Sequence, residues 1–521
     1  MKHIKAFAMP AIFFGIAQAE DAGGGGFAVQ FAGQFALGLP PVDMRGDFLR
    51  DKAPHRLCER FMRFIIMGRS CAPVVELGHE GQAGPEGGCR QGVVRYAATM
   101  TKAILLSGLA ALALVAAPVS AQKAAPTPEA VAAAALKAAP VFDGHNDVPW
   151  TLLQRTGNVL RDVDFHDTTE LGRHPTRGVM HTDLRRLRAG GVGAQYWSVY
   201  VPSNVNEQLA VQQTVEQIDV MRRLAARYPK DLMLAENSAE LEKAMKAGKI
   251  AGMLGIEGGQ SIGSSLGVLR EMYGMGVRYM TLTHSKNVPW ADSGTDAPVH
   301  DGLTDFGVLV VREMNRIGMI VDLSHVSEAT MRDALAESKA PVIFSHSSAR
   351  GVTEHPRNVP DAVLPLVKAN GGIVMVTFVP GFVNAGVRAH GLMRTAEEAR
   401  LKAQFPEKPV AATAGLAEWG KANPAPRATI SDVADHIDYI RKMIGIDHIG
   451  IAGDYDGIDT VPQGLEDVST YPALFTELAR RGYPQAELMQ ISNGNALRVL
   501  KAVEAYAASQ KDQPVIETAV K

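Results

Sequence analysis

Apolar and polar positions follow two repeating patterns from residue 141 onward. Eight short runs are almost continuously apolar, and stretches with a helical period lie between them. The runs are Val141–Phe142, Gly193–Val201, Ala251–Ile256, Arg278–Thr283, Met319–Ser324, Pro341–Ser345, Gly371–Phe378 and His448–Ala452. Strands that are apolar on both faces are typical of a parallel sheet buried between helices. Eight such strand–helix units predict a (β/α)8 barrel, an α/β fold.

The helical pattern is clearest in three stretches between these runs. They are Asn206–Tyr228, Ser238–Ala247 and Thr304–Ile317, and Gly318 is expected to end the last of them. Residues 380–427 are rich in Ala, Pro and charged side chains and form the longest candidate insertion. We predict one barrel domain over residues 141–505, followed by a tail at 506–521.

The first part of the chain departs from this pattern. Residues 1–99 show no steady period and are interpreted as an upstream extension without a fold. Residues 100–121 combine a lysine, an apolar run and a small-x-small exit, which is typical of a secretory signal peptide. A membrane anchor is the alternative, but this run is shorter than the roughly 20 apolar residues that span a bilayer. Residues 122–140 are an Ala/Pro-rich lead-in in which we expect a helix.

A second interpretation places the signal peptide at Met1–Ala19 and makes residues 20–99 a pro-segment. Both interpretations predict an exported protein, periplasmic or secreted, without a membrane anchor. In the first, all three cysteines (Cys58, Cys71 and Cys89) lie outside the mature chain. Disulfides, thiolate metal ligands and a cysteine nucleophile are then excluded.

Composition narrows the partners of the predicted domain. Hydrophobic residues make up 46% of the 521 residues, which is enough for a large core. The 53 Lys and Arg side chains nearly balance 55 Asp and Glu side chains. The chain has no excess of basic charge that would indicate nucleic-acid binding, and a small, polar, charged ligand stays open.

Residues that suit metal binding follow most of the predicted strands. In a (β/α)8 barrel the carboxyl ends of the strands meet on one face, so these residues are expected to come together. They are His145, Asp147, Glu257, His284, His325, His346 and Asp454. Side chains two apart on an extended chain point to the same face, so His145 and Asp147 can bind one ion together. Imidazole and carboxylate ligands suit two borderline divalent ions, zinc before cobalt or manganese, with Glu257 as the candidate bridge.

Each of these residues also has a purely structural interpretation. A histidine after a strand often caps a helix, Glu257 suits a helix N-terminus, and Asp454 or Asp456 suits a turn before Gly457. Their shared position at strand ends favours the metal site. Of the remaining candidates, Trp150, Trp197 and Trp290 suit the pocket or, for Trp197 above all, the core, and His181 and His448 suit structural roles.

Seven motifs resemble the renal or membrane dipeptidase family of binuclear zinc barrels. In order they are FDGHNDVPW, GIEGGQS, LTHSKNVPWADS, VDLSHVSE, FSHSSARG, RNVPD and GDYDG, and together they extend from about residue 141 to about residue 500. The resemblance implies a zinc dipeptidase that acts on dipeptides with an L- or D-residue at the C-terminal position. It also suggests a homodimer.

The resemblance implies a role for each candidate residue. The metal ligands would be His145 and Asp147 for one zinc and His325 and His346 for the other, with Glu257 bridging the pair. His284 would contact the scissile carbonyl and stabilise the oxyanion. Arg357 would bind the carboxylate of the substrate. Asp454 would carry the proton of the attacking water, and Asp456 is the less favoured candidate.

This chemistry is self-consistent, and two alternatives stay open. A water shared by two zinc ions has its pKa lowered towards about 7, which supplies hydroxide at neutral pH. A guanidinium such as that of Arg357 makes two parallel bonds to a carboxylate, which favours short peptides with a free C-terminus. One alternative is a metal hydrolase of another amide or a lactone. The other is a non-catalytic periplasmic peptide- or metal-binding protein, against which the presence of His284 and Asp454 argues.

Overall fold

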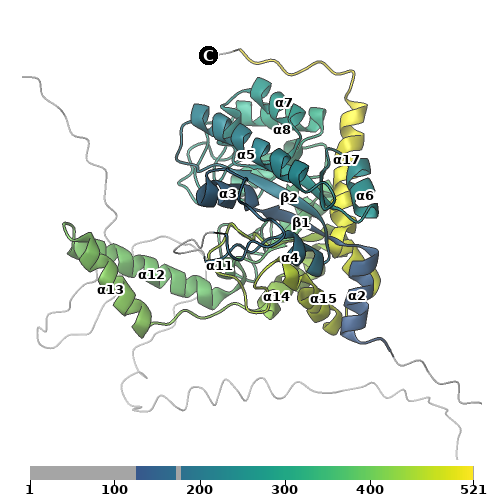
Figure 1. Cartoon of the computed structure of the whole chain (residues 1–521). Coiled ribbons are helices and arrows are strands. Elements are labelled where there is room, and N and C mark those ends of the chain that lie inside the picture. Colours follow the sequence, from purple (N-terminus) through teal and green to yellow (C-terminus); the bar gives the residue numbers. More distant parts are fainter. Residues whose placement is uncertain (1–124, 172–177, 520–521) are drawn as a thin grey trace, which may run out of the picture. The chain divides into compact units, whose positions relative to one another are not determined.

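The computed structural model describes residues 125–171 and 178–519, in which parallel strands alternate with helices (Figure 1). The strands are β1 (Val141–Asn146), β2 (Val192–Tyr200), β3 (Leu232–Leu234), β4 (Ile250–Glu257), β5 (Val277–Thr281), β6 (Ile320–Asp322), β7 (Ile343–Phe344), β8 (Ile373–Thr377) and β9 (Ile449–Ala452). The predicted extension, the predicted signal peptide and the three cysteines lie outside the described residues.

Eight of these strands form a closed barrel. The sheet order is β2-β1-β9-β8-β7-β6-β5-β4, and a further pairing of β2 with β4 closes the ring. Every pairing is parallel, and the barrel strands are buried along almost their whole length. The predicted (β/α)8 barrel is therefore confirmed, and each of the eight predicted strands overlaps an observed one.

The remaining strand, β3, was not predicted. Leu232–Leu234 pairs with Ile250–Gly252 at the start of β4, and β5 pairs with the same edge of β4 from Leu254 onward. β3 therefore lies beside the barrel and is not one of the eight strands that form it. Three residues are too few for a strand pattern to stand out from the sequence.

Helices occupy the connections between the strands. They are α2 (Pro128–Ala138), α3 (Val148–Thr156), α4 (Leu184–Ala189), α5 (Glu207–Arg227), α6 (Ser238–Lys246), α7 (Leu266–Gly274), α8 (Asp305–Ile317), α9 (Glu328–Glu337), α10 (Leu364–Asn370), α11 (Pro380–Val383), α12 (Ala385–Gln404), α13 (Pro409–Ala422), α14 (Ile430–Ile444), α15 (Tyr471–Arg480), α16 (Gln485–Met489) and α17 (Asn495–Ser509). Short helical turns add η1 (Gly259–Ile262), η2 (Ile446–His448), η3 (Val468–Thr470) and η4 (Gln490–Gly494). Across the described part of the chain, no helix combines the length and the apolar character that a membrane crossing requires.

The three predicted helices begin and end where their sequence indicates. The side chains of Asn206 and Thr304 accept the backbone N–H groups that α5 and α8 leave free at their first turns. α8 ends at Gly318, whose φ of 88° suits a residue without a side chain. Local capping chemistry therefore sets these boundaries.

Segments on both sides of the barrel sequence pack against it. The expected lead-in helix is α2, which buries Ala132, Ala135 and Leu136. After the last helix, the backbone of Ile516 makes hydrogen bonds with Arg270 and Glu313. These contacts connect both ends of the described chain to the barrel helices.

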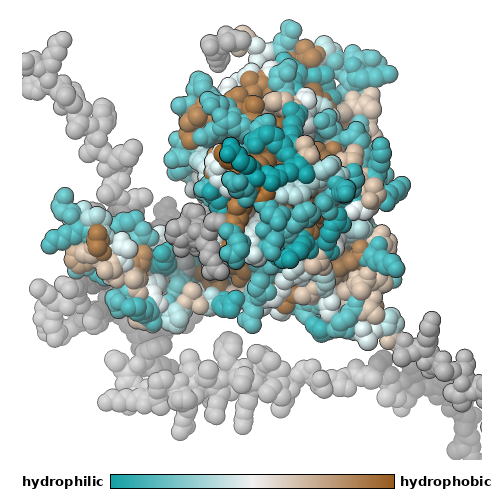
Figure 2. All heavy atoms as spheres, in the orientation of Figure 1, coloured by the Kyte–Doolittle hydropathy of each residue, from teal (hydrophilic) through white to brown (hydrophobic). Residues whose placement is uncertain are grey.

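The predicted insertion forms α11, α12 and α13. α12 and α13 pack against each other and are here called the arm, residues 385–422 (Figure 1). Leu401 is the buried residue of α12, and Ala412 is that of α13. Figure 2 shows hydrophobic residues on the surface of the arm among hydrophilic ones. The arm therefore contributes little to the hydrophobic core.

His436 on α14 gives the fold a dependence on pH. Its Nδ1 accepts the N–H of Ala349 at 3.0 Å, and its Nε2 lies 3.2 Å from the carbonyl oxygen of Val383. A neutral ring with its proton on Nε2 makes both hydrogen bonds. Burial lowers the pKa of His436 to about 4, from the usual histidine value of 6.5. Below pH 6.5 His436 is protonated in the unfolded chain, whereas in the folded chain it stays neutral until the pH falls to about 4.

We therefore expect His436 to contribute fully to stability above pH 6.5 and to lose that contribution as the pH falls towards about 4. Each unit of pKa difference corresponds to roughly 1.4 kcal/mol. Urea unfolding from pH 4 to 8 checks this. Between pH 4 and pH 6.5 the free energy of unfolding should rise less steeply with pH in His436→Gln than in wild type. The difference in slope should correspond to the uptake of about one proton on unfolding. An equal slope in both proteins would contradict the assignment.

Candidate active site

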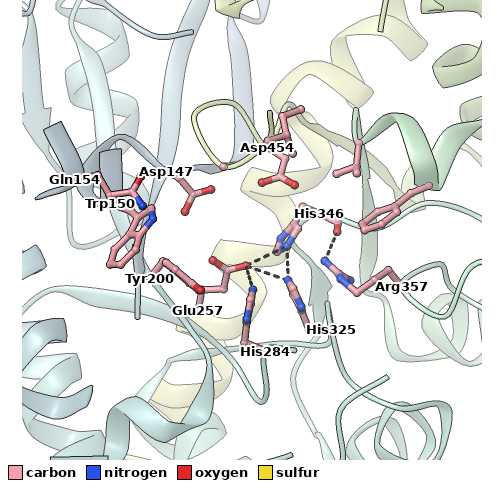
Figure 3. A pocket seen from close by; sticks show the side chains of 14 residues that line it. Asp147, Trp150, Gln154, Tyr200, Glu257, His284, His325, His346, Arg357 and Asp454 are labelled. Atoms are coloured by element: carbon pink, nitrogen blue, oxygen red, sulfur yellow. Dashed lines mark hydrogen bonds and ion pairs between the residues drawn. The ribbon is translucent and has the colours of Figure 1, made fainter. Parts of the chain in front are cut away.

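A cavity of about 350 Å³ lies at the carboxyl ends of the barrel strands (Figure 3). Its lining residues are Asp147, Trp150, Gln154, Tyr200, Glu257, His284, His325, His346, Arg357, Val379, Phe382, Asp454, Gly457 and Ile458. Every residue predicted to take part in metal or substrate binding is in this set except His145. His145 is fully buried directly beside the cavity, in contact with Asp147 and Glu257. Distant parts of the sequence therefore converge as predicted.

His145 at the end of β1 directs one ring nitrogen towards two carboxylates. Its Nε2 lies 3.4 Å from Asp147 Oδ2 and 3.4 Å from Glu257 Oε2, and has no hydrogen-bond partner among the described residues. Its Nδ1 lies 2.9 Å from the hydroxyl of Tyr279. A buried imidazole nitrogen facing two carboxylate oxygens has the surroundings of a metal ligand.

The other oxygen of Glu257 faces a second pair of histidines. Oε1 lies 3.0 Å from His325 Nε2 and 3.3 Å from His346 Nε2, and these two nitrogens are 2.9 Å apart. His284 Nε2 approaches the same oxygen at 3.7 Å. Figure 3 shows the three rings pointing at Glu257 from separate loops. Glu257 therefore has one carboxylate oxygen towards each candidate metal pair.

Buried negative charge dominates the electrostatics of the cavity. Asp147, Glu257 and Asp454 are all buried within reach of the same rings. Burial raises the pKa of Asp454 well above its usual range, and the neighbouring Asp147 and Glu257 raise it further. Burial would raise the pKa of Glu257 too, but His145 and His284 hold it well below its usual range.

The two histidines that face Glu257 Oε1 are held neutral. Burial lowers the pKa of His325 and of His346 well below the usual histidine value. A neutral imidazole has the free lone pair that a metal ion requires. Three crowded carboxylates beside neutral imidazoles are the donor set that divalent cations stabilise, so the residues present fit a metal centre.

Arg357 provides a buried positive charge on the cavity wall. Its guanidinium donates to Ser347 Oγ at 3.3 Å and to the carbonyl oxygen of His346 at 3.2 Å, and lies 5.3 Å from the ring centre of Phe382. Burial lowers the pKa of Arg357 to about 10. Within residues 125–171 and 178–519 no carboxylate is close enough to pair with it. A substrate carboxylate is the partner that this environment lacks.

Two residues of the site have an unusual backbone conformation. His325 has a φ of 70° and Asp454 a φ of 55°. Left-handed backbone is unfavourable for residues with a side chain and occurs most often where function requires a particular side-chain direction. The local fold therefore places these two side chains at some cost in stability.

Gly457 keeps space for two carboxylates. A Cβ atom at this position would lie 2.2 Å from Asp147 Oδ2 and 2.8 Å from Asp454 Oδ1. We expect Gly457→Ala to displace both carboxylates and to lower kcat/KM by at least about tenfold, as when groups that support a metal site are lost. Metal content and steady-state kinetics check this. Gly420→Ala on α13, where a Cβ meets nothing within 4 Å, is the control and should keep full activity.

The structure shows which of the remaining sequence candidates line the cavity and which have structural contacts elsewhere. Asp456 does not line the cavity, because its carboxylate accepts the N–H of His181 at 2.8 Å while its own N–H donates to the ring of His181 at 3.0 Å. His448 makes a hydrogen bond with the carbonyl oxygen of Gly372. Trp150 lines the cavity, whereas Trp197 and Trp290 are buried in the core.

Some lining residues were missed by the sequence analysis. Tyr200 ends β2 and packs edge-on against Trp150, with ring centres 5.0 Å apart. Tyr200 could have been found from the sequence, because it lies at the end of a predicted strand. The search at strand ends considered only residues that bind metal ions and so passed over tyrosine. Phe382 and Gln154 come from helices, where no sequence pattern distinguishes them from core or surface positions.

The family model of the membrane dipeptidases, peptidase family M19, matches residues 129–514. The chain belongs to this family. Among relatives in the M19 family, it is 43% identical to Dipeptidase 3 of Rattus norvegicus over 383 residues, which are 73% of this chain and 68% of the relative. Dipeptidase 3 of Mus musculus is 42% identical over 73% of this chain and 67% of its own length.

Solved structures of M19-like proteins share the fold. A probable dipeptidase from Pseudomonas aeruginosa superposes with a TM-score of 0.62 at 23% identity, over 73% of this chain and 99% of that structure. A metallopeptidase from Rhodobacter sphaeroides, liganded with a phosphinate mimic of the dipeptide L-Ala-D-Ala, gives 0.58 at 23% identity over 70% and 99%. As a member of the membrane dipeptidase family, the chain is a metallo-dipeptidase, a hydrolase of peptide bonds that uses a metal cofactor and acts on small peptides.

Proposed function

We propose that this M19 enzyme uses two zinc ions to hydrolyse dipeptides that carry a free C-terminal carboxylate. The observation that supports two ions most directly is the position of Glu257. Its Oε2 faces His145, and its Oε1 faces His325 and His346. A carboxylate with separate histidines on each oxygen is suited to bridge two metal ions.

Each residue of the cavity has a task in this reaction. Two divalent ions, when bound, lower the pKa of a shared water and polarise the substrate carbonyl. His284 would donate to the carbonyl oxygen as negative charge develops there. Asp454, which lines the cavity beside Asp147 and Glu257, would take the proton of the attacking water and pass it to the leaving amine. Arg357 would bind the terminal carboxylate and so limit the length of the substrate.

Zinc content and hydrolysis measured on one purified sample test the proposal. L-Ala-L-Ala and L-Ala-D-Ala are suitable substrates, because they differ in the configuration of the residue next to Arg357. We expect about two zinc ions per chain, with turnover abolished by chelation and restored by zinc. One ion, or two ions without turnover on any dipeptide, would contradict the proposal and direct attention to another amide or a lactone.

We also propose that the enzyme is exported after cleavage near residue 121 and forms a homodimer. The apolar run and small-x-small exit at residues 100–121 support export. The mass of the exported protein tests the cleavage position: a terminus near Gln122 agrees with cleavage near residue 121, and one near Glu20 contradicts it. Sedimentation velocity tests the dimer, which a purely monomeric boundary would exclude.

A further inference from the structure

His346 is oriented by a chain of two hydrogen bonds that starts at a buried carboxylate. Its Nδ1 lies 2.8 Å from Ser345 Oγ, and Ser345 Oγ donates to Asp322 Oδ2 at 2.6 Å. Asp322 ends β6 and is fully buried, and it is not among the residues that line the cavity. Asp322 therefore acts on the cavity through other residues.

The orientation of the Asp322 carboxylate is fixed by the backbone. Its Oδ1 accepts the N–H groups of Ser324 at 3.1 Å and Ser345 at 2.8 Å. Its Oδ2 accepts the hydroxyls of Thr281 at 2.5 Å and Ser345 at 2.6 Å. One oxygen therefore faces peptide groups and the other faces hydroxyl groups.

This arrangement determines which nitrogen of His346 carries the proton. A hydroxyl has one hydrogen, and that of Ser345 is donated to Asp322. Ser345 Oγ can then only accept from the ring, so Nδ1 is protonated. The Nε2 lone pair is left to point at Glu257 Oε1, 3.3 Å away, where the metal site is expected.

We propose that Asp322, through Ser345, is a positioning residue that selects the metal-binding tautomer of His346. The proposal rests on the proposed binuclear site and adds a determinant of its affinity. Ligand histidines generally depend on the group bound to their other ring nitrogen, and loss of that group typically weakens metal binding by about 10- to 100-fold.

Asp143 provides a natural comparison within the same barrel. Its Oδ1 accepts the N–H groups of His145 and Gly453, both at 3.1 Å, and its Oδ2 accepts the hydroxyl of Tyr471 at 2.5 Å. Each of the two carboxylates thus accepts one backbone N–H from two residues further along the chain and one from the segment that follows a neighbouring strand. Among the described residues, however, no histidine ring hydrogen-bonds to the hydroxyl of Tyr471, because His145 faces Tyr279 instead.

Replacement of the Asp322 carboxylate by an amide keeps the shape of the side chain but changes which group donates the hydrogen bond between residue 322 and Ser345. In Asp322→Asn the peptide N–H groups keep the amide oxygen at the Oδ1 position, so the NH2 group takes the place of Oδ2. Ser345 then accepts from the amide, so its hydroxyl hydrogen is released from Asp322 and can be donated to His346 Nδ1. This favours the Nε2–H tautomer of His346, which cannot bind a metal ion through Nε2. Ser345→Ala merely removes the preference.

Zinc affinity by competition with a chelating dye tests the proposal on the full chain. We expect wild type and Asp143→Asn to hold two zinc ions equally well. In Ser345→Ala one of the two ions should bind about 10- to 100-fold more weakly. In Asp322→Asn the same ion should bind more weakly still, although the shape of the side chain is retained.

The controls separate this effect from a loss of stability. Ser492 is fully buried and donates to the carbonyl oxygen of Ala139 at 2.7 Å on the other side of the fold, so Ser492→Ala should lower Tm without changing zinc affinity. Equal affinity in wild type, Ser345→Ala and Asp322→Asn would overturn the inference, as would an equal loss in Asp143→Asn. If Asp322→Asn does not fold, Ser345→Ala decides alone. A wild type with fewer than two zinc ions would instead refute the proposed function.

Discussion

Glu257→Gln is expected to abolish dipeptide hydrolysis and to leave the protein with little bound zinc. The amide has one oxygen where two are needed, and its NH2 group would point at either His145 or the pair formed by His325 and His346. We expect kcat/KM to fall by more than the roughly 10²- to 10³-fold that follows loss of one oxyanion donor. Metal analysis after dialysis and steady-state kinetics measure both effects.

Glu313→Gln is the matched control for this prediction. Glu313 is a fully buried glutamate on α8 that pairs with Arg270 at 3.0 Å and Arg316 at 2.7 Å, away from the cavity. Its replacement should lower Tm but retain both zinc ions and kcat. Full zinc content and substantial turnover in Glu257→Gln would show that this carboxylate does not bridge the metal ions.

Arg357→Ala is expected to lower kcat/KM for dipeptides by about 10²- to 10³-fold, mostly through KM. Removal of one partner of a buried, hydrogen-bonded charge pair costs about 2–5 kcal/mol, and each 1.4 kcal/mol corresponds to a factor of ten. The guanidinium already makes two hydrogen bonds, to Ser347 and to the backbone of His346, so its position does not depend on substrate. Lysine cannot reproduce this geometry.

Dipeptide amides make this prediction specific. Wild type should prefer a dipeptide over its C-terminal amide by a factor similar to the loss in Arg357→Ala, because the amide lacks the negative charge. The variant should treat both substrates alike. A variant that keeps the preference for the free carboxylate would place carboxylate recognition elsewhere in the cavity.

Much of the fold and site followed from one regularity of the sequence. Apolar runs end in His, Glu or Asp, and the ends of parallel strands meet on one face, so His145, Glu257 and Asp454 were predicted to converge across more than half of the chain. The structure brings them together with His325 and His346. Backbone geometry alone is sufficient for this step, because strand order in a barrel follows chain order.

Other features depend on contacts that no local pattern records. The space that Gly457 leaves for Asp147 and Asp454 appears only when the loops after β1 and β9 are adjacent. The hydrogen bonds of Asp322 with Thr281 and Ser345 join three strands. Serine, threonine and glycine are common in any loop, so their roles could not be predicted from residue type.

The arm has a consequence for protein engineering. Its helices bury little beyond Leu401 and Ala412, and the turn at residues 405–408 between them is largely exposed. Exposed turns between elements that contribute little to a core are where inserted sequence is best tolerated. We therefore expect a fluorescent reporter or an affinity tag introduced at this turn to leave the barrel and its cavity intact.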